Sequence, residues 1–487
     1  MTTRGTAPGT AHSRWTALAV LCAGMLMIIL DGTIVTVALP AIQADLGFTA
    51  EGLTWTVNAY LIAFGGLLLL AGRLGDLLGG RRIFVAGLVL FTAASLLAGL
   101  AGGQELLIAA RFAQGIGGAM ASAVSLGMIV TLFPEPGERG KAIGAFSFVG
   151  AAGASIGQVL GGVLTEAVGW HWIFFVNLPI GLAAVLLSLR VLAADGPARS
   201  LRGLDLPGAA LVTAGLMLGV YAIVSIERST TGALLLGAVS ALLLAGFLLR
   251  QRYAAEPLLP LRLLRSRRVA AANLVQVLMV SALFGFQVLI ALYLQNVLGY
   301  GAAATGFAML PAAVVIGGVS LLLSAPLVAR FGERTVLLGG LGLLVVAIGL
   351  LTRLPADASY VLHLLPTMLL AGGFGLAVAA LTSLAMADAA PADAGVSSGL
   401  FNTTQQVGGA LGVAVLVTLA GSRGQALAEA GRSQAEAMTA GFRAAFLLGT
   451  LLLLAATALA AVALRPAAGR VVATSRREEK SLIRSGR

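Results

Sequence analysis

The chain has 487 residues, of which 59% are hydrophobic and only 10% are charged, and its mean hydropathy is +0.98. Soluble domains carry about 25% charged residues, so this composition cannot cover a water-soluble particle of this size with polar surface. A soluble enzyme is therefore excluded. A disordered chain is excluded as well, because disorder requires low hydrophobicity and high charge. The composition indicates a polytopic membrane protein.

Metal-binding and disulfide-forming side chains are scarce. Cys22 is the single cysteine, so no internal disulfide and no CxxC metal motif can form. With only three histidines, we expect no metal centre and no cofactor. The first apolar run begins near Trp15 and continues for over 20 residues, which is too long for the apolar core of a cleavable signal peptide.

Apolar runs long enough to cross the hydrocarbon core, about 20 residues each, recur along the whole chain. Such runs satisfy their own backbone hydrogen bonds in lipid as helices, so we expect an all-α protein with 14 transmembrane helices. The runs lie at about 16–38, 52–71, 83–102, 106–130, 141–164, 172–192, 207–226, 233–249, 270–295, 304–328, 335–351, 362–384, 398–420 and 442–464.

The distribution of Lys and Arg predicts the orientation, because cytoplasmic loops carry an excess of both. If the N-terminus is cytoplasmic, the cytoplasmic segments hold 25 of the 31 basic residues, and the opposite orientation inverts this ratio. We therefore expect a multi-pass protein of the cell membrane with both termini in the cytoplasm. The basic residues mark this face, so we expect no nucleic-acid partner.

Polar stretches divide the chain into parts. We expect two pseudo-symmetric six-helix bundles, with two extra helices linking them. The expected parts are the N-terminal bundle at 16–192, cytoplasmic linkers with two extra spans (about 207–226 and 233–249) at 193–269, the C-terminal bundle at 270–464, and a cytoplasmic tail at 465–487.

An internal repeat supports two related halves. Leu, Gly and Arg fall at the same offsets in the segment Gly72–Arg81 after the second span and in the segment Ala325–Arg334 after the tenth. A Leu-Gly pair also precedes both the second and the tenth span. Parallel repeats of six spans are typical of transporters in which two bundles rock about a central site.

Motifs on successive spans add to this pattern. In chain order they are Asp31-Gly-Thr-Ile-Val-Thr-Val-Ala-Leu-Pro40, Trp55-Thr-Val-Asn58-Ala-Tyr60, the Gly72–Arg82 segment, Arg111-Phe-Ala-Gln114-Gly115, Trp170-His-Trp172 with Asn177-Leu-Pro179, and Phe401-Asn402-Thr-Thr-Gln405-Gln406. With these motifs the chain resembles the major facilitator superfamily, in its branch of 14-span drug:proton antiporters, over about residues 15–465. The resemblance implies export of lipophilic small molecules such as drugs, antibiotics and dyes, driven by proton influx through alternating access.

Asp31 is the one carboxylate deep inside a predicted span, where a charge costs about 2.5–3.5 kcal/mol. It lies roughly 24 Å from the inner end of its span, and Arg111 lies roughly 9 Å from the outer end of the fourth. In a core of about 30 Å these depths agree. We expect Asp31 and Arg111 to form the proton-coupling site, although a static ion pair that only fixes packing remains the alternative.

The resemblance assigns two further motifs. Gly72, Asp76, Gly79 and Arg81 belong to a predicted cytoplasmic gating loop, in which Asp76 accepts from helix N-terminal amides or pairs with Arg81 or Arg139. A solvated loop is the alternative. The glycine ridge of the fifth span corresponds to the antiporter motif, whose close contact is expected to seal the two bundles, with tight packing alone as the alternative. The ridge consists of Gly153, Gly157, Gly161 and Gly162.

A substrate cavity requires apolar walls with a few polar groups. The candidates are polar or aromatic residues of the second, fourth, ninth and thirteenth spans, although hydrogen bonding between helices explains any single one equally well. They are Asn58, Tyr60, Gln114, Gln276, Phe284, Gln287, Tyr293, Asn402 and Gln406.

Two other functions fit a polytopic chain. A facilitator or importer of a metabolite would use the same fold. A membrane enzyme would need paired acids, a histidine cluster or a nucleophile, and none of these occurs. No Walker-type phosphate-binding loop is present either. We expect a transporter that is not an enzyme and that functions as a monomer, with protons, a lipophilic substrate and the bilayer as its partners.

Overall fold

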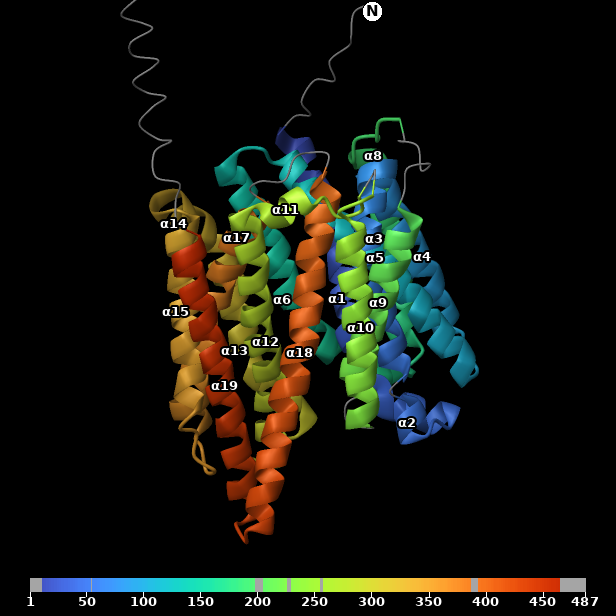
Figure 1. The fold of residues 1–487 in the computed structure, drawn as a ribbon. Helices are drawn as coiled ribbons and strands as arrows, with labels where there is room; N and C mark the ends of the chain where they lie inside the picture. The colour runs from blue at the N-terminus through green and yellow to red at the C-terminus, as the bar shows by residue number, and fades with distance from the viewer. Residues whose placement is uncertain are drawn as a thin grey trace, which may run out of the picture.

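The computed structural model describes residues 11–53, 55–197, 205–225, 229–254, 257–386 and 393–464. Every regular element in these residues is helical. Figure 1 shows long upright rods that gather into two bundles. Helix α1 begins and helix α19 ends at the same face, at the top of Figure 1, which is called the terminal face below. The opposite face is called the distal face.

The first bundle contains the helices that precede residue 192, and α7 and α8 together form its sixth rod. These helices are α1 (Ala11–Leu46), α2 (Ala50–Leu53), α3 (Trp55–Leu78), α4 (Gly80–Gly99), α5 (Gln104–Leu132), α6 (Pro136–Val168), α7 (Trp172–Phe175) and α8 (Asn177–Val191). The extra pair and the helix that follows it are α9 (Leu206–Val224), α10 (Thr230–Arg250) and α11 (Leu261–Arg265).

The second bundle contains the remaining helices, and two of its rods include a π-helical turn. They are α12 (Arg267–Asn296), α13 (Ala302–Gly318) with the π turn Val319–Leu323 and α14 (Ser324–Phe331), α15 (Glu333–Leu351), the π turn Tyr360–Leu364 with α16 (Leu365–Leu370) and α17 (Gly372–Met386), α18 (Ala394–Glu429) and α19 (Gln434–Ala463).

Thirteen helical segments among the described residues are long and apolar enough to cross a membrane. Helix α6, with 33 residues, is the remaining long rod, and it packs along α1. At 1.5 Å per residue it is about 50 Å long, which exceeds the hydrocarbon thickness. The predicted fold class, an all-α polytopic membrane protein, is therefore confirmed.

The internal repeat has a counterpart in the backbone. Gly79, between α3 and α4, has φ of +110°, and Gly332, between α14 and α15, has φ of +80°. Gly47 and Gly299, which precede the second and tenth predicted spans, have φ of +64° and +70°. Only glycine adopts such angles readily, so both halves turn the chain with glycine at equivalent positions.

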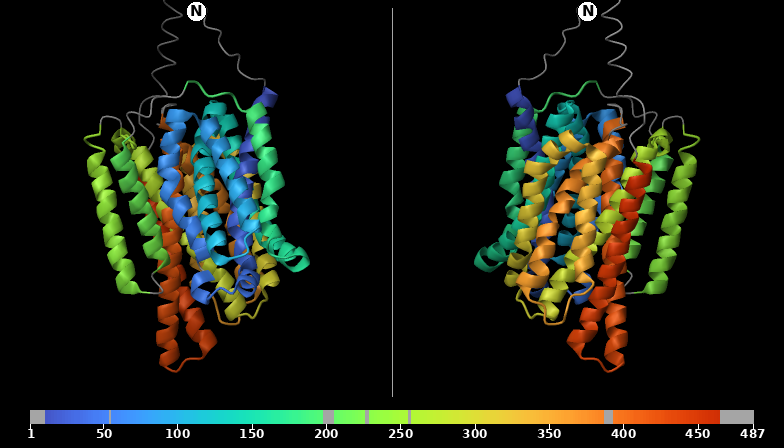
Figure 2. Two further views of the ribbon diagram at one scale, coloured as in Figure 1. Left: turned by 90° about the vertical axis from the view of Figure 1, so that its right-hand side faces the viewer. Right: turned by 90° about the vertical axis from the view of Figure 1, so that its left-hand side faces the viewer.

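The extra helices stand at one side of the molecule (Figure 2), and α9 packs on α3 of the first bundle. Helix α9 lies on α3, where a Cβ atom on Gly66 would come within 2.3 Å of the Met217 side chain. The rings of Trp55 and Tyr221 stack at 5.6 Å between centroids. A buried apolar cluster joins α9 and α10 to Leu69 of α3 and to Val396 of α18. The pair therefore contacts both bundles.

Asp205 organises the terminal-face end of the extra pair. Its carboxylate accepts hydrogen bonds from the Gly208 N–H (3.0 Å), from Arg250 Nε (2.9 Å) and from Gln251 Nε2 (2.9 Å). Burial raises the pKa of Asp205, but the hydrogen bond from Arg250 and those from Gly208 and Gln251 outweigh it and hold the pKa below its ordinary value. Gln251 Oε1 also accepts from the Leu259 N–H, which ties the hairpin to the segment before α11.

Three predicted boundaries change. The expected loop at 72–82 is helical on both sides of Gly79, because α3 continues to Leu78 and α4 begins at Gly80. The last two spans were expected at 398–420 and 442–464, but α18 and α19 are longer at their distal ends and project beyond the other helices (Figure 1). The linker contains the helix α11, which was not predicted. The predicted tail at 465–487 lies outside the described residues.

Candidate functional site

Asp31 and Arg111 form a fully buried ion pair inside the first bundle. The side chains are 0% and 1% exposed, and Arg111 Nη1 lies 2.5 Å from Asp31 Oδ2. The second carboxylate oxygen, Oδ1, accepts from Gln114 Nε2 at 3.0 Å and from Asn177 Nδ2 at 2.9 Å. Three helices, α1, α5 and α8, therefore supply the carboxylate and its donors, and both carboxylate oxygens have partners within the protein.

Arg111 makes further contacts in addition to the ion pair. Its Nε donates to the Thr56 carbonyl of α3 at 2.8 Å, and Nη1 also donates to Gln114 Oε1 at 2.9 Å. Its guanidinium carbon lies 4.5 Å from the centre of the Tyr60 ring, a cation–π contact. Because a guanidinium stays protonated, any change of charge in this network has to occur at Asp31.

Two side chains of this network were not among the predicted site residues. Ser95 of α4 accepts from Gln114 Nε2 at 2.8 Å, and it lies 3.4 Å from Asn177 Nδ2. Asn177 Oδ1 is buried and has no partner among the described residues. Asn177 stands in the sequence motif at 170–179, which was the one available signal. Ser95 gave no signal, because serine is common in packed membrane helices.

The two bundles meet in the terminal half of the molecule, where α18 begins against α3. Asp76, near the end of α3, accepts from the Gly395 N–H (2.7 Å) and from the Val396 N–H (2.9 Å). Both amides belong to the first turn of α18, whose unpaired N–H groups attract negative charge. Of the expected partners, Asp76 thus takes helix N-terminal amides, and they belong to the other bundle.

The backbones of α3 and α18 touch at this point. A Cβ atom on Gly72 would lie 2.4 Å from the Gly395 carbonyl oxygen, and one on Gly395 would lie 2.3 Å from that of Gly72. Deeper in the interface, Asn402 Nδ2 of α18 donates to the Ser122 carbonyl of α5 at 3.2 Å. Side chains at either glycine position are therefore incompatible with this arrangement.

The other two residues predicted for the gating loop, Gly79 and Arg81, make their contacts within the first bundle. The Gly79 turn receives Asp195, whose carboxylate accepts from the Arg81 N–H (3.2 Å) and the Arg82 N–H (2.8 Å) and so caps α4. The Arg81 side chain donates to the Leu189 carbonyl at 2.5 Å. The expected Asp76–Arg81 pairing is therefore replaced, because Arg81 points toward the end of α8.

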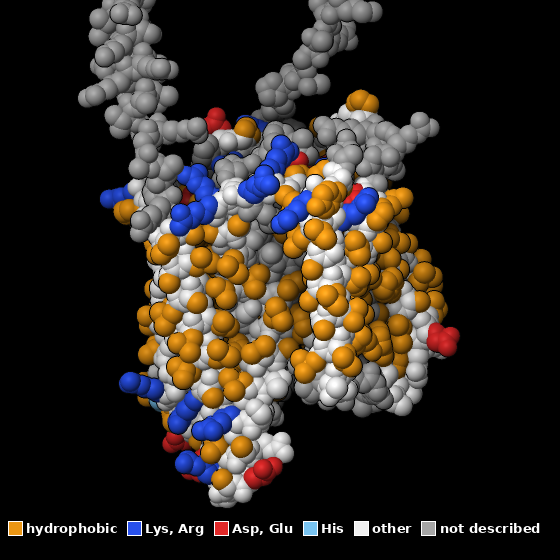
Figure 3. Space-filling view, viewed as in Figure 1, with side chains coloured by type: hydrophobic (Ala, Val, Ile, Leu, Met, Phe, Trp, Pro, Cys, Tyr) orange, Lys and Arg blue, Asp and Glu red, His pale blue; other side chains and the backbone are white. Residues whose placement is uncertain are grey.

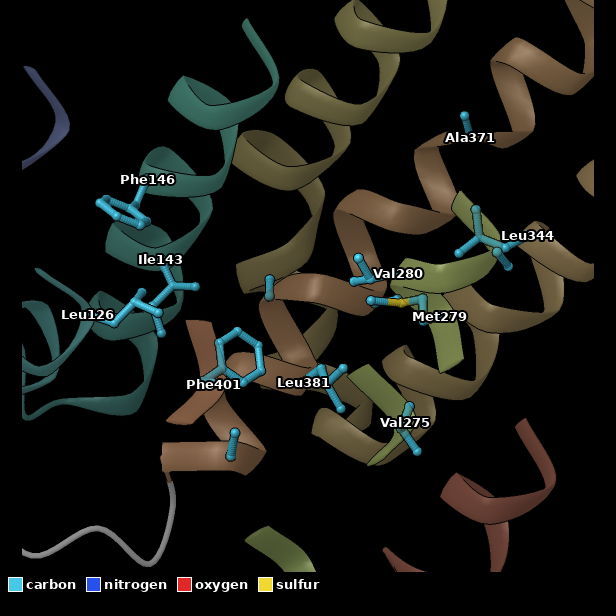
Figure 4. Close-up of a cluster of buried hydrophobic side chains, with 14 of the residues drawn as sticks. Leu126, Ile143, Phe146, Val275, Met279, Val280, Leu344, Ala371, Leu381 and Phe401 are labelled. Atoms are coloured by element: carbon cyan, nitrogen blue, oxygen red, sulfur yellow. The ribbon is translucent and has the colours of Figure 1, made fainter. Parts of the chain in front are cut away.

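Two further contacts close the terminal half. Asp393, the N-cap residue of α18, forms an ion pair with Arg262 of α11, so the linker also reaches the start of α18. Figure 4 shows Phe401 and Leu381 of the second bundle facing Leu126 and Ile143 of the first. These side chains belong to one buried apolar cluster. The interface thus combines the polar contacts of Asp76 and Asn402 with a buried apolar cluster.

The glycine ridge of α6 does not seal the two bundles, which corrects the expectation drawn from the family motif. A Cβ atom on Gly157 would lie 2.0 Å from Thr33 Oγ1, and one on Gly161 would lie 2.8 Å from the Ile34 carbonyl oxygen. Gly153 and Gly162 also have α1 as their nearest neighbour. The ridge faces α1, within the same bundle and beside Asp31.

Contact between α6 and the second bundle comes instead from the terminal half of α6. A Cβ atom on Gly144 would lie 2.5 Å from the Ser320 carbonyl oxygen. Ser320 Oγ donates to the Gly144 carbonyl at 3.3 Å. The helical period explains why the ridge does not meet the second bundle. The glycines at 153, 157 and 161 share one face of α6, and that face points away from the second bundle.

The predicted substrate residues have different surroundings among the described residues. Tyr60 and Gln114 belong to the Asp31 network, and Asn402 bridges the bundles. Tyr293 is a packing residue, because its hydroxyl donates to the Pro355 carbonyl at 2.6 Å and its ring lies against Phe442.

The other candidates differ in their surroundings. Gln276 is fully buried, and its amide has no partner among the described residues. Phe284 packs over Gly409. Asn58 and Gln406 are half-buried and Gln287 is exposed, so their roles stay predictions.

Comparisons with known proteins agree with this architecture. The chain matches the family described as Major Facilitator Superfamily over residues 21–413. It is 41% identical over 428 residues to the puromycin resistance protein of Streptomyces alboniger, which covers 87% of this chain and 85% of that protein. It is 38% identical to the cephamycin export protein of Amycolatopsis lactamdurans, with 84% and 85% covered.

A solved structure shows the same fold. The human organic anion transporter TETRAN superposes with a TM-score of 0.68 at 16% identity and covers 92% of this chain and 99% of its own. The two-bundle architecture, the family match and the extensive identity to the two bacterial relatives lead to one conclusion: the chain belongs to the Major Facilitator Superfamily of membrane transporters.

Proposed function

We propose that this protein is a proton-coupled exporter of lipophilic small molecules of the antibiotic class. The buried Asp31–Arg111 pair carries the coupling part of the proposal, because Asp31 is the group in this network that can take up and release a proton. The names of the puromycin, cephamycin, tetracenomycin and lincomycin relatives support export of antibiotics. The protein functions as a monomer in the cell membrane.

Protonation of Asp31 changes the forces within the first bundle. The neutral carboxyl no longer offsets the charge of Arg111, which keeps its hydrogen bonds to the Thr56 carbonyl and to Gln114. A buried charge without its partner is strongly unfavourable, so the protonated state favours a rearrangement that exposes or re-pairs Arg111. Release of the proton restores the pair. Asp31 is thus a switch between two packings of the same helices.

The helices of the network also carry the gate. Helix α3 has the Thr56 carbonyl near its distal end and Asp76 near its terminal end, and α5 bears both Arg111 and the Ser122 carbonyl. A shift of either rod near Asp31 therefore acts on the contacts of α3 and α5 with α18. Rigid helices that touch both places provide the coupling between proton and gate.

The terminal face is the cytoplasmic face in this proposal. The distribution of Lys and Arg supports this orientation, and the contacts of Asp76, Gly72 and Asn402 then close the cytoplasmic side. Figure 3 shows the surface notched toward the distal end between α18 and α10. The conformation corresponds to a cytoplasm-closed stage of alternating access.

Topology reporters test this orientation. A reporter inserted near residue 260 should be cytoplasmic, and one near residue 430 should be external, because an odd number of spans separates them. An impermeant label applied to intact cells should therefore modify only the second reporter. Labelling of both or of neither contradicts the proposed topology.

Transport in inside-out vesicles tests the function. With an acidic lumen, vesicles that contain the protein should accumulate puromycin and other lipophilic antibiotics, and collapse of the pH gradient should release them. Vesicles without the protein are the control. Gradient-independent equilibration of the compounds indicates a facilitator, and accumulation that requires ATP excludes secondary transport.

A further inference from the structure

A groove of about 820 Å³ lies outside the bundle core, between α3, α5 and α9. Its walls include Trp55 and Ile62 of α3, Glu105 and Phe112 of α5, and Met217 and Tyr221 of α9. Trp55, Glu105 and Tyr221 stand near the distal ends of their helices, and Ile62 and Phe112 lie seven residues further in, roughly 10 Å deeper. The groove therefore runs from the distal boundary of the membrane into its apolar region.

One end of the groove is polar and the rest is apolar. Glu105 is the charged residue of the lining, and it is exposed in the first turn of α5. Among the residues that the structure describes, none forms a hydrogen bond or an ion pair with the Glu105 carboxylate. The stacked rings of Trp55 and Tyr221 lie in the same lining. A carboxylate beside π faces attracts a cation, and aromatic rings of this kind prefer the membrane interface.

We infer that this groove binds a membrane lipid whose headgroup carries an ammonium group. The ammonium group lies at Glu105, and an acyl chain occupies the apolar part between Ile62, Phe112 and Met217. Three membrane-spanning helices form the walls, so the surrounding lipid is the molecule that meets the groove at high concentration. The negative charge of the lining disfavours anionic headgroups. The groove exists only because α9 packs on α3, which gives the extra helices a role in lipid binding.

The lipid site and the Asp31 network share two helices. Trp55 in the groove precedes Thr56, whose carbonyl accepts from Arg111 Nε. Phe112 in the groove follows Arg111 itself. A bound acyl chain thus packs against the outer faces of the α3 and α5 segments that hold Arg111 on their inner faces. The site does not depend on the proposed transport reaction.

Tryptophan quenching by brominated lipids tests this site in the full-length protein. The fluorescence of Trp55 is obtained as the difference in tryptophan fluorescence between the wild type and Trp55→Phe, both in liposomes of defined composition. Brominated phosphatidylethanolamine should quench this signal at a mole fraction roughly two- to fivefold lower than brominated phosphatidylglycerol does. This ratio is expected for an exposed carboxylate–ammonium contact. Glu105→Gln should abolish this preference. Glu166→Gln, at an exposed position on α6, is the matched control and should retain it.

The other results overturn the inference. Equal quenching by phosphatidylethanolamine, phosphatidylcholine and phosphatidylglycerol in the wild type excludes headgroup recognition. A preference that survives Glu105→Gln excludes the assigned carboxylate. If a monocationic dye quenches Trp55 in a Glu105-dependent manner while ethanolamine lipid shows no preference, the groove is a site for small molecules and not for lipid. Circular dichroism of each variant shows whether the helical fold is retained.

Discussion

The Asp31→Asn variant should insert and fold but lose gradient-driven export completely. The amide keeps the size of the side chain and can still accept from Gln114 or Asn177, but it cannot bind and release a proton. In the inside-out vesicle assay, accumulation should fall to the level of vesicles without the protein. Equilibration of substrate without a gradient should persist, because the neutral amide resembles the protonated carboxyl and the gate residues Gly72, Asp76 and Asn402 are all retained.

The matched control for this variant is Asp357→Asn, which removes an exposed carboxylate on the distal side and should export as the wild type does. Arg111→Ala should also be inactive, but through a different cause. Removing one partner of a buried ion pair costs about 3–5 kcal/mol, so this variant should lose thermal stability as well. Wild-type accumulation by Asp31→Asn contradicts the proton-site proposal, and loss of activity in Asp357→Asn shows that the assay responds to the charge of the chain instead.

Gly72→Val should hold the terminal half of the transporter open. The first carbon of the new side chain would lie 2.4 Å from the Gly395 carbonyl oxygen, and backbone on both sides leaves no room to relax. Ser398, which is fully buried in α18 beside this interface, serves as a reporter when it is changed to cysteine in a Cys22→Ser background. An impermeant thiol reagent applied from the terminal face should label Ser398→Cys in the Gly72→Val variant and leave it unlabelled in the parent.

Gly339→Val is the control for that experiment, because a Cβ atom at Gly339 meets nothing within 4 Å and the residue lies in another rod, α15. Asp76→Ala should shift the labelling in the same direction but by less. The loss of a helix-capping side chain costs about 1 kcal/mol, which corresponds to roughly a fivefold shift between closed and open states. Parent-like protection of the cysteine in Gly72→Val contradicts a gate at the α3–α18 contact.

The sequence alone determined that this is a membrane protein, where its transmembrane helices lie, and that Asp31 is the charge buried deepest in them. A bilayer demands continuous apolar runs with internally satisfied backbone groups, and both are local properties that can be counted along the chain. Deep charges are expensive in lipid, so Asp31 was conspicuous by position, and depth alone placed it level with Arg111, which it contacts at 2.5 Å. The repeat was also readable, because a turn at positive φ requires glycine in both halves.

The tertiary structure alone decided which surfaces meet. The partners of Asp76 lie about 320 residues away and are backbone amides, which every residue but proline carries and which therefore leave no mark in a sequence. The glycine period of α6 predicted a face for close packing but not the neighbour, and the neighbour is α1 instead of the second bundle. Ser95 and Asn177 join the Asp31 network because five helices, α1, α3, α4, α5 and α8, converge at one depth. In a chain of apolar helices, the helical period defines faces, whereas only packing in three dimensions pairs them.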